Sequence, residues 1–91
     1  MPIVDVAAVR AALGLTQVEL AAVLDVQALT VSRWERGASQ PRVRAAALLA
    51  AAGRVVNPAA VGDAVRAALA LRGAPVAARE FSIAVVGEGR P

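Results

Sequence analysis

Residues 16–36 read TQVELAAVLDVQALTVSRWER, and their pattern predicts two short helices separated by three residues. The stretch opens on a capping box, in which the hydroxyl of Thr16 accepts a hydrogen bond from the amide of Glu19 while the carboxylate of Glu19 reaches back to the amide of Thr16. The pairing satisfies two free amides at a helix start. A helix is therefore predicted over residues 17–24.

A second helix is predicted shortly afterwards, over residues 28–36. Val31 and Trp34 share the face that would pack on the core, and Gly37 follows as a left-handed stop. Only residues 25–27 separate the two helices. Two short helices joined by three residues form a helix-turn-helix, whose second helix fits a DNA major groove about 12 Å wide.

Helices are also predicted on both sides of this pair, from the spacing of apolar residues and from capping signals. The predicted ranges are residues 6–13, 41–53 and 59–71. Alanine, the best helix former, is abundant throughout. The chain is therefore predicted to be all-α, with five helices.

Residues 81–86 have a different pattern. Phe81, Ile83 and Val85 occupy every second position, which is the period of a β-strand. A single strand leaves its backbone groups unpaired, so it must pair with residues 3–4 or with the same strand of a second chain. We therefore expect Phe81, Ile83 and Val85 to contribute to dimerisation, together with the fifth helix.

The length of 91 residues fits one domain. We divide it into a helix-turn-helix region, residues 1–57, and a C-terminal dimerisation element of the same domain, residues 58–91. The net charge is +3, and all ten basic residues are arginines. Within residues 33–44, only Glu35 opposes four arginines, which form a patch suited to phosphates: Arg33, Arg36, Arg42 and Arg44.

Several function classes lack their residues in this sequence. Histidine, cysteine, lysine and tyrosine do not occur, which argues against an enzyme, a metal site and a bound cofactor. No uncharged apolar run approaches the roughly 18 residues of a membrane span, and the first residues do not resemble a signal peptide. The expected location is the cytoplasm, at the nucleoid.

Three segments carry a family resemblance: residues 14–21 read GLTQVELA, residues 31–37 read VSRWERG, and Pro41 follows. Together they closely resemble the Cro/cI-type phage-repressor family, also called the xenobiotic-response-element family. The resemblance covers about residues 6–52. It implies a phage-repressor-like helix-turn-helix domain that binds double-stranded DNA.

The resemblance also implies residue roles. Gln17 is expected to anchor a phosphate and brace the second helix of the motif, and Arg10 and Glu35 to form an internal ion pair. Base reading is expected at the start of that helix and on its outer surface, at Gln27, Ala28, Leu29, Ser32 and Arg33. The other expected phosphate contacts are Thr30, Arg36 and Arg42, and the neighbouring Arg44 extends them.

Two of these positions differ in chemistry from the rest. Arg33 can bind guanine O6 and N7 with both arms of its guanidinium, which discriminates by ~1–3 kcal/mol. Ala28 and Leu29 depart from the polar residues that the family often carries there, so they can only pack on thymine methyls or sugars. Leu29 suits a contact with another protein equally well.

The sequence thus predicts a transcriptional regulator, most simply a repressor, that binds a palindromic operator as a homodimer with half-sites ~34 Å apart. Two alternatives remain open. One is an antitoxin-type autorepressor, which has a toxin as a second partner. The other is a protein-interaction module that keeps the helix-turn-helix fold, and the steep salt dependence of phosphate contacts would distinguish it.

Overall fold

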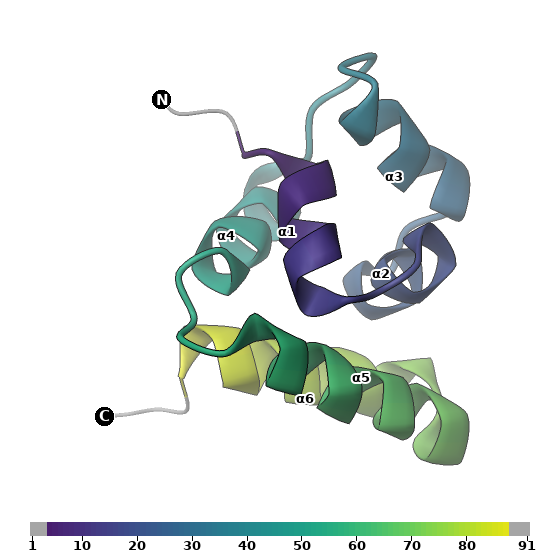
Figure 1. The fold of residues 1–91 in the computed structure, drawn as a ribbon. Helices are drawn as coiled ribbons and strands as arrows, with labels where there is room; N and C mark the ends of the chain where they lie inside the picture. The colour runs from purple at the N-terminus through teal and green to yellow at the C-terminus, as the bar shows by residue number, and fades with distance from the viewer. Residues whose placement is uncertain (1–3, 88–91) are drawn as a thin grey trace.

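The computed structural model describes residues 4–87, which form six α-helices joined by short loops (Figure 1). In chain order the helices are α1 (Val6–Leu13), α2 (Gln17–Leu24), α3 (Ala28–Glu35), α4 (Val43–Ala52), α5 (Pro58–Arg72) and α6 (Ala74–Val86). Helices α1 to α4 form the upper part of the molecule in Figure 1, and α5 and α6 lie beneath them as an antiparallel pair.

The first helices begin and end where the sequence predicts, because their caps are local. Asp5 accepts a hydrogen bond from the amide of Ala8 at 3.0 Å at the start of α1, and Gly14 closes the helix at a φ of 74°. At the start of α2, both bonds of the predicted capping box are present, at 3.0 Å and 2.9 Å. The later boundaries shift slightly: α4 begins only after Pro41, with Arg42 as its N-cap.

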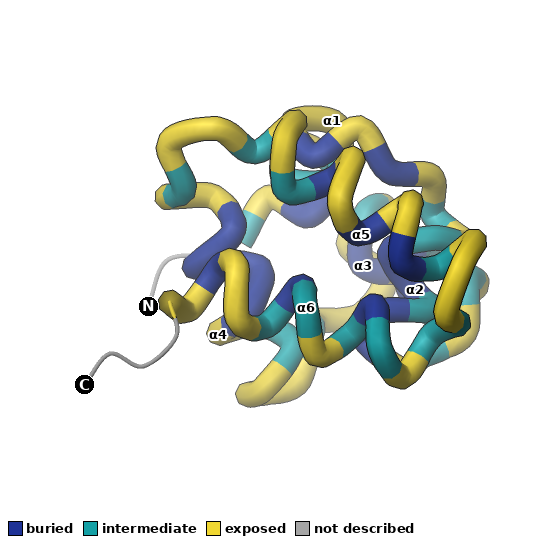
Figure 2. Tube along the Cα trace, turned by 90° about the horizontal axis from the view of Figure 1, so that it is seen from below, coloured by how far each residue is buried: buried dark blue, intermediate teal, exposed yellow. Residues whose placement is uncertain are grey.

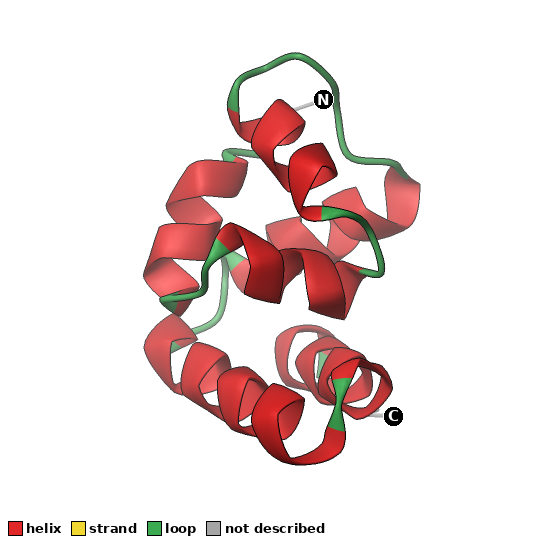
Figure 3. Ribbon diagram, turned by 90° about the vertical axis from the view of Figure 1, so that its right-hand side faces the viewer, coloured by secondary structure: helices red, strands yellow, loops and turns green. Residues whose placement is uncertain are grey.

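The predicted strand over residues 81–86 is wrong, because these residues form the second half of α6 (Figure 3). No strand occurs within residues 4–87. The buried positions of α6 are Ala77, Phe81 and Val85, which recur every four residues and so lie on one helical face. Ile83, assigned to the same face by the period of two, is 43% exposed. Pro75 lies in the first turn of α6, where its fixed φ suits a helix.

This correction changes the basis for dimerisation. Phe81 is fully buried and Val85 is 8% exposed, so both pack inside their own chain and are not available to a second one. Ile83 alone of the three remains at the surface. The alternative pairing with residues 3–4 also has no strand to pair with, and residue 3 lies outside the described residues.

One hydrophobic core joins the helix-turn-helix part to the C-terminal helix pair. Its fully buried large side chains come one from each of the six helices: Leu13, Leu20, Val31, Leu49, Val65 and Phe81. Figure 2 shows buried segments, in dark blue, both on α1 to α4 and on α5 and α6. Burial of a side chain such as that of Phe81 contributes roughly 2–3 kcal/mol. Helix α6 therefore contributes to the stability of the core that the first four helices share.

At Gly62, helix α5 packs closely against the end of α1. A Cβ atom added at Gly62 would lie 1.7 Å from the carbonyl oxygen of Leu13, at the end of α1. The absence of a side chain thus lets the α5 backbone pack directly on the turn between α1 and α2. That turn leads into the helix-turn-helix.

No single helix within residues 4–87 is long and apolar enough to cross a lipid bilayer. Helices α1 and α2 pass the length and composition criteria only when taken together, and they meet at an angle of 100°. The apolar helix α4 has ten residues, against the roughly 20 that a span requires.

Candidate nucleic-acid interface

The turn between α2 and α3 sets the direction in which α3 points. Asp25 ends α2 in the left-handed conformation at a φ of 58°, and the amide of Val26 donates to the carbonyl of Ala21 at 3.0 Å. Val31 is fully buried and Trp34 is 9% exposed, so these two side chains hold one face of α3 on the core. The opposite face of α3 is presented to solvent.

Most of the residues expected to read bases lie along that outer face. Gln27, Leu29 and Arg33 are exposed and Ser32 is half-buried, whereas Ala28 is half-buried and packs against the core. Gln27 is the N-cap of α3, but its side chain makes no capping hydrogen bond. Its amide group is therefore free of the helix end that it precedes.

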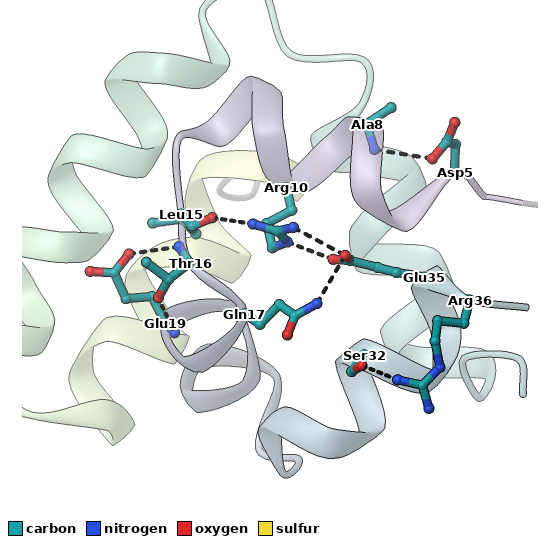
Figure 4. Close-up of polar contacts among 10 residues, drawn as sticks. All are labelled: Asp5, Ala8, Arg10, Leu15, Thr16, Gln17, Glu19, Ser32, Glu35 and Arg36. Carbon is teal, nitrogen blue, oxygen red and sulfur yellow. Dashed lines mark hydrogen bonds and ion pairs between the residues drawn. The ribbon is translucent and has the colours of Figure 1, made fainter. Parts of the chain in front are cut away.

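Ser32 is engaged within the protein. Its hydroxyl accepts a hydrogen bond from the Nη1 of Arg36, one turn further along α3 (Figure 4). This contact orients the Arg36 side chain along the helix surface. Ser32 thus holds the positive charge of Arg36 beside α3. It also lies on the outer face of the helix itself.

The predicted ion pair between Arg10 and Glu35 is present and joins α1 to the end of α3. Two hydrogen bonds form it: Arg10 Nε to Glu35 Oε2 at 2.5 Å, and Arg10 Nη2 to Glu35 Oε1 at 3.0 Å. The side chains are 24% and 11% exposed, so the pair is largely shielded from water. The third arm of the guanidinium, Nη1, donates to the carbonyl of Leu15 at 3.0 Å.

Gln17 completes this network from the first residue of α2. Its Nε2 donates to Glu35 Oε1 at 3.1 Å, so one carboxylate links α1, α2 and α3 (Figure 4). The hydrogen bond from Arg10 holds the pKa of Glu35 below its usual value against the opposing effect of burial, and the bond from Gln17 adds to the lowering. Glu35 is therefore ionised at neutral pH. Its negative charge is neutralised within the protein by Arg10.

The remaining positive charge of this region is not neutralised by other side chains. Arg33, Arg36, Arg42 and Arg44 are all exposed, and none forms an ion pair within the part of the chain that the structure describes. Thr30 is half-buried beside them on α3. Since Glu35 is occupied by Arg10, four guanidiniums without an acidic partner among residues 4–87 lie on and after the exposed end of α3.

A contact between Arg66 and Glu19 near this region was not predicted from the sequence. Arg66 of α5 donates from Nε to Glu19 Oε2 at 3.1 Å, from Nη2 to Glu19 Oε1 at 3.3 Å, and from Nη2 to the carbonyl of Gly14. Glu19 belongs to the capping box of α2. The two residues are 47 positions apart, and no pattern in the sequence pairs them.

Comparison with protein families gives one match. A family model of helix-turn-helix proteins, of the Cro/C1 type, matches residues 6–59. The match runs from the first residue of α1 into the first turn of α5, so most of α5 and all of α6 lie outside it. Neither curated proteins nor solved structures gave a match to the chain.

Proposed function

Because this chain belongs to the Cro/C1-type helix-turn-helix family of DNA-binding regulators, we propose that it is a sequence-specific transcriptional repressor in the cytoplasm. In this proposal it binds a palindromic operator as a homodimer and represses by occluding a promoter. The observation that carries it is the solvent-facing side of α3, where exposed Gln27, Leu29 and Arg33 adjoin arginines that have no acidic partner among the described residues.

Each part of the interface has a separate task. The outer face of α3 enters the major groove, where Gln27 and Arg33 supply the hydrogen bonds that distinguish bases. Ala28 and Leu29 pack on thymine methyls or sugars, and Ser32 supports Arg36. The phosphate contacts fix the position of the protein along the duplex without reading sequence: Gln17, Thr30, Arg36, Arg42 and Arg44.

The Arg33→Ala variant tests base reading most directly. Selection from a pool of random duplexes is expected to enrich a palindrome for the wild type, and the variant is expected to lose a guanine preference in each half-site. Loss of a bidentate contact worth ~1–3 kcal/mol corresponds to an affinity about 5- to 150-fold lower for the selected duplex.

Arg54→Ala is the matched control, because Arg54 is an exposed arginine in the loop between α4 and α5 and the net charge changes equally. Equal selection profiles for the two variants would contradict base reading by Arg33. A salt titration of the wild type checks the phosphate contacts, since log affinity falls with log salt by about 0.9 per phosphate neutralised. A flat titration would favour the protein-interaction module.

A single observation favours that second function. Leu29 is 52% exposed in the middle of the proposed reading face, where an apolar side chain also suits a partner protein. An antitoxin-type autorepressor would use the same DNA contacts and would differ in binding a toxin as well. Pull-down experiments with the wild type and with a Leu29→Ala variant as bait distinguish the two roles of Leu29. They test whether Leu29 contacts a protein or DNA.

For the homodimer, we propose a contact through the outer face of α5 and α6. This face carries exposed Leu71 and Val86 and the partly exposed Ile83. Between the two helices lies a hollow of about 250 Å³, with a lining that is apolar except for one carboxylate: Val61, Ala64, Val65, Glu80, Ile83 and Ala84. Helix α3 lies at the other end of the molecule (Figure 1), so this contact leaves the reading face free.

Ile83→Glu is expected to convert the dimer to a monomer at micromolar concentration in light scattering, because a charge would be buried in the apolar contact. The expected rise in the dimer dissociation constant is about tenfold or more. Val43→Glu is the comparison variant, since exposed Val43 lines a second apolar groove, of about 670 Å³, between α1 and α4. If only Val43→Glu dissociates the dimer, or if the wild type is a monomer, the proposed contact is wrong.

A further inference from the structure

Arg66 connects α5 to the start of α2. Its guanidinium donates to both carboxylate oxygens of Glu19, at 3.1 Å and 3.3 Å, and to the carbonyl of Gly14. Oε1 of Glu19 also accepts from the amide of Thr16 at 2.9 Å. A side chain outside the family match therefore holds the capping box at the start of the helix-turn-helix.

The position of Arg66 is set by the packing of its own helix. Gly62 lies one turn earlier on the same face of α5 and rests against the carbonyl of Leu13. The Cα of Gly62 thus brings α5 up to the turn before α2, and the long side chain at residue 66 reaches the carboxylate beyond it. A second acidic neighbour, Asp63, is 4.0 Å from the guanidinium and 79% exposed, so it competes weakly.

Glu19 places a negative charge close to a proposed phosphate contact. It lies two residues after Gln17, in the first turn of α2. The hydrogen bond from Arg66, followed by that from the amide of Thr16, lowers the pKa of Glu19, so the carboxylate is ionised at neutral pH. Left alone, this charge would repel a DNA phosphate within the Debye length of roughly 10 Å at 0.1 M salt.

We propose that Arg66 is a positioning residue for DNA binding: it neutralises Glu19 beside the start of α2, so that a phosphate can bind at Gln17. Arg66 itself touches no DNA in this arrangement. The inference rests on the proposed DNA-binding function. It makes the C-terminal helix pair a determinant of DNA affinity in addition to its part in the core.

The test is a double-mutant cycle between Arg66 and Glu19. Binding to a fluorescein-labelled duplex of about 20 base pairs is measured by anisotropy at about 50 mM salt, where phosphate contacts are strong. Arg66→Gln is expected to lower the affinity about threefold to fivefold, the size expected for one unscreened charge roughly 10 Å away. Arg66→Gln combined with Glu19→Gln is expected to return to within about twofold of wild type, because glutamine keeps the capping box without the charge.

The matched control is Arg72→Gln, which removes an exposed arginine of the same helix that pairs with Glu80 instead. Thermal unfolding of each variant ensures that binding is compared on folded protein. Equal affinities for Arg66→Gln and Arg72→Gln would overturn the inference. So would a double variant as weak as Arg66→Gln, since that result would mean a purely structural role.

The outcome for the wild type separates this inference from the function on which it rests. If the wild-type protein does not bind the duplex, the proposed function fails and the inference fails with it. If it binds and the cycle shows no coupling, only the role of Arg66 is rejected. A raised salt concentration provides a further check, because the deficit of Arg66→Gln should shrink as its electrostatic cause is screened.

Discussion

Gly62→Ala will separate α5 from α1 and lower the free energy of unfolding by more than about 3 kcal/mol. The added Cβ would lie 1.7 Å from the carbonyl oxygen of Leu13 and 2.7 Å from its carbonyl carbon. Both are backbone atoms at the end of a helix, so neither can turn aside as the tip of a side chain could. Denaturation by urea, followed by circular dichroism, measures the loss.

Gly53→Ala is the control for this prediction. Gly53 has a right-handed backbone conformation with a φ of −69°, and a Cβ there would meet other atoms only at 3.5 Å or more. Its replacement is expected to be neutral or to stabilise the protein by about 0.4–1 kcal/mol, because alanine restricts the unfolded chain. Similar losses in the two variants would show that the contact between Gly62 and Leu13 is not the cause.

Arg10→Met is expected to cost about 2–4 kcal/mol, because it leaves the Glu35 carboxylate, 11% exposed, without its guanidinium. Gln17 alone then remains to hydrogen-bond that carboxylate. The estimate lies at the lower end for buried pairs, since Arg10 is 24% exposed. Urea denaturation at neutral pH measures the cost, and a loss below about 0.5 kcal/mol would place the pair among ordinary surface charges.

Two controls identify the ion pair as the cause. Arg10→Met combined with Glu35→Leu removes both charges and is expected to recover much of the lost stability. The pH dependence gives the second control: the folded protein lowers the pKa of Glu35, so the stabilisation is complete above the unfolded pKa of about 4.3 and is lost as the pH falls through the lower folded value. The difference between wild type and Arg10→Met should therefore diminish in acid.

Elements whose causes are local could be predicted from the sequence. The cap at Asp5, the capping box of Thr16 and Glu19, and the left-handed stop at Gly14 each involve residues a few positions apart. For this reason α1 and α2 have the predicted bounds, and α3 begins as predicted and ends one residue early. The exposure of Arg33 also followed from helical geometry once Val31 and Trp34 were assigned to the core.

The ion pair between Arg10 and Glu35 was reached in another way. The residues lie 25 positions apart, and their periodicity does not connect them. The resemblance to a family supplied the pairing, and the structure adds what the resemblance did not specify: the two-bond geometry and the bond from Gln17 to the same carboxylate.

The C-terminal part of the fold depends on contacts between residues far apart in the chain. Phe81, Ile83 and Val85 fit a strand period as well as Ala77, Phe81 and Val85 fit a helical one, and short apolar segments do not distinguish the two. These residues form a helix because α6 buries Phe81 completely among the other helices. The contacts of Gly62 with Leu13 and of Arg66 with Glu19 likewise exist only once α5 packs across the turn before α2, since each joins residues about 50 positions apart that no local rule relates.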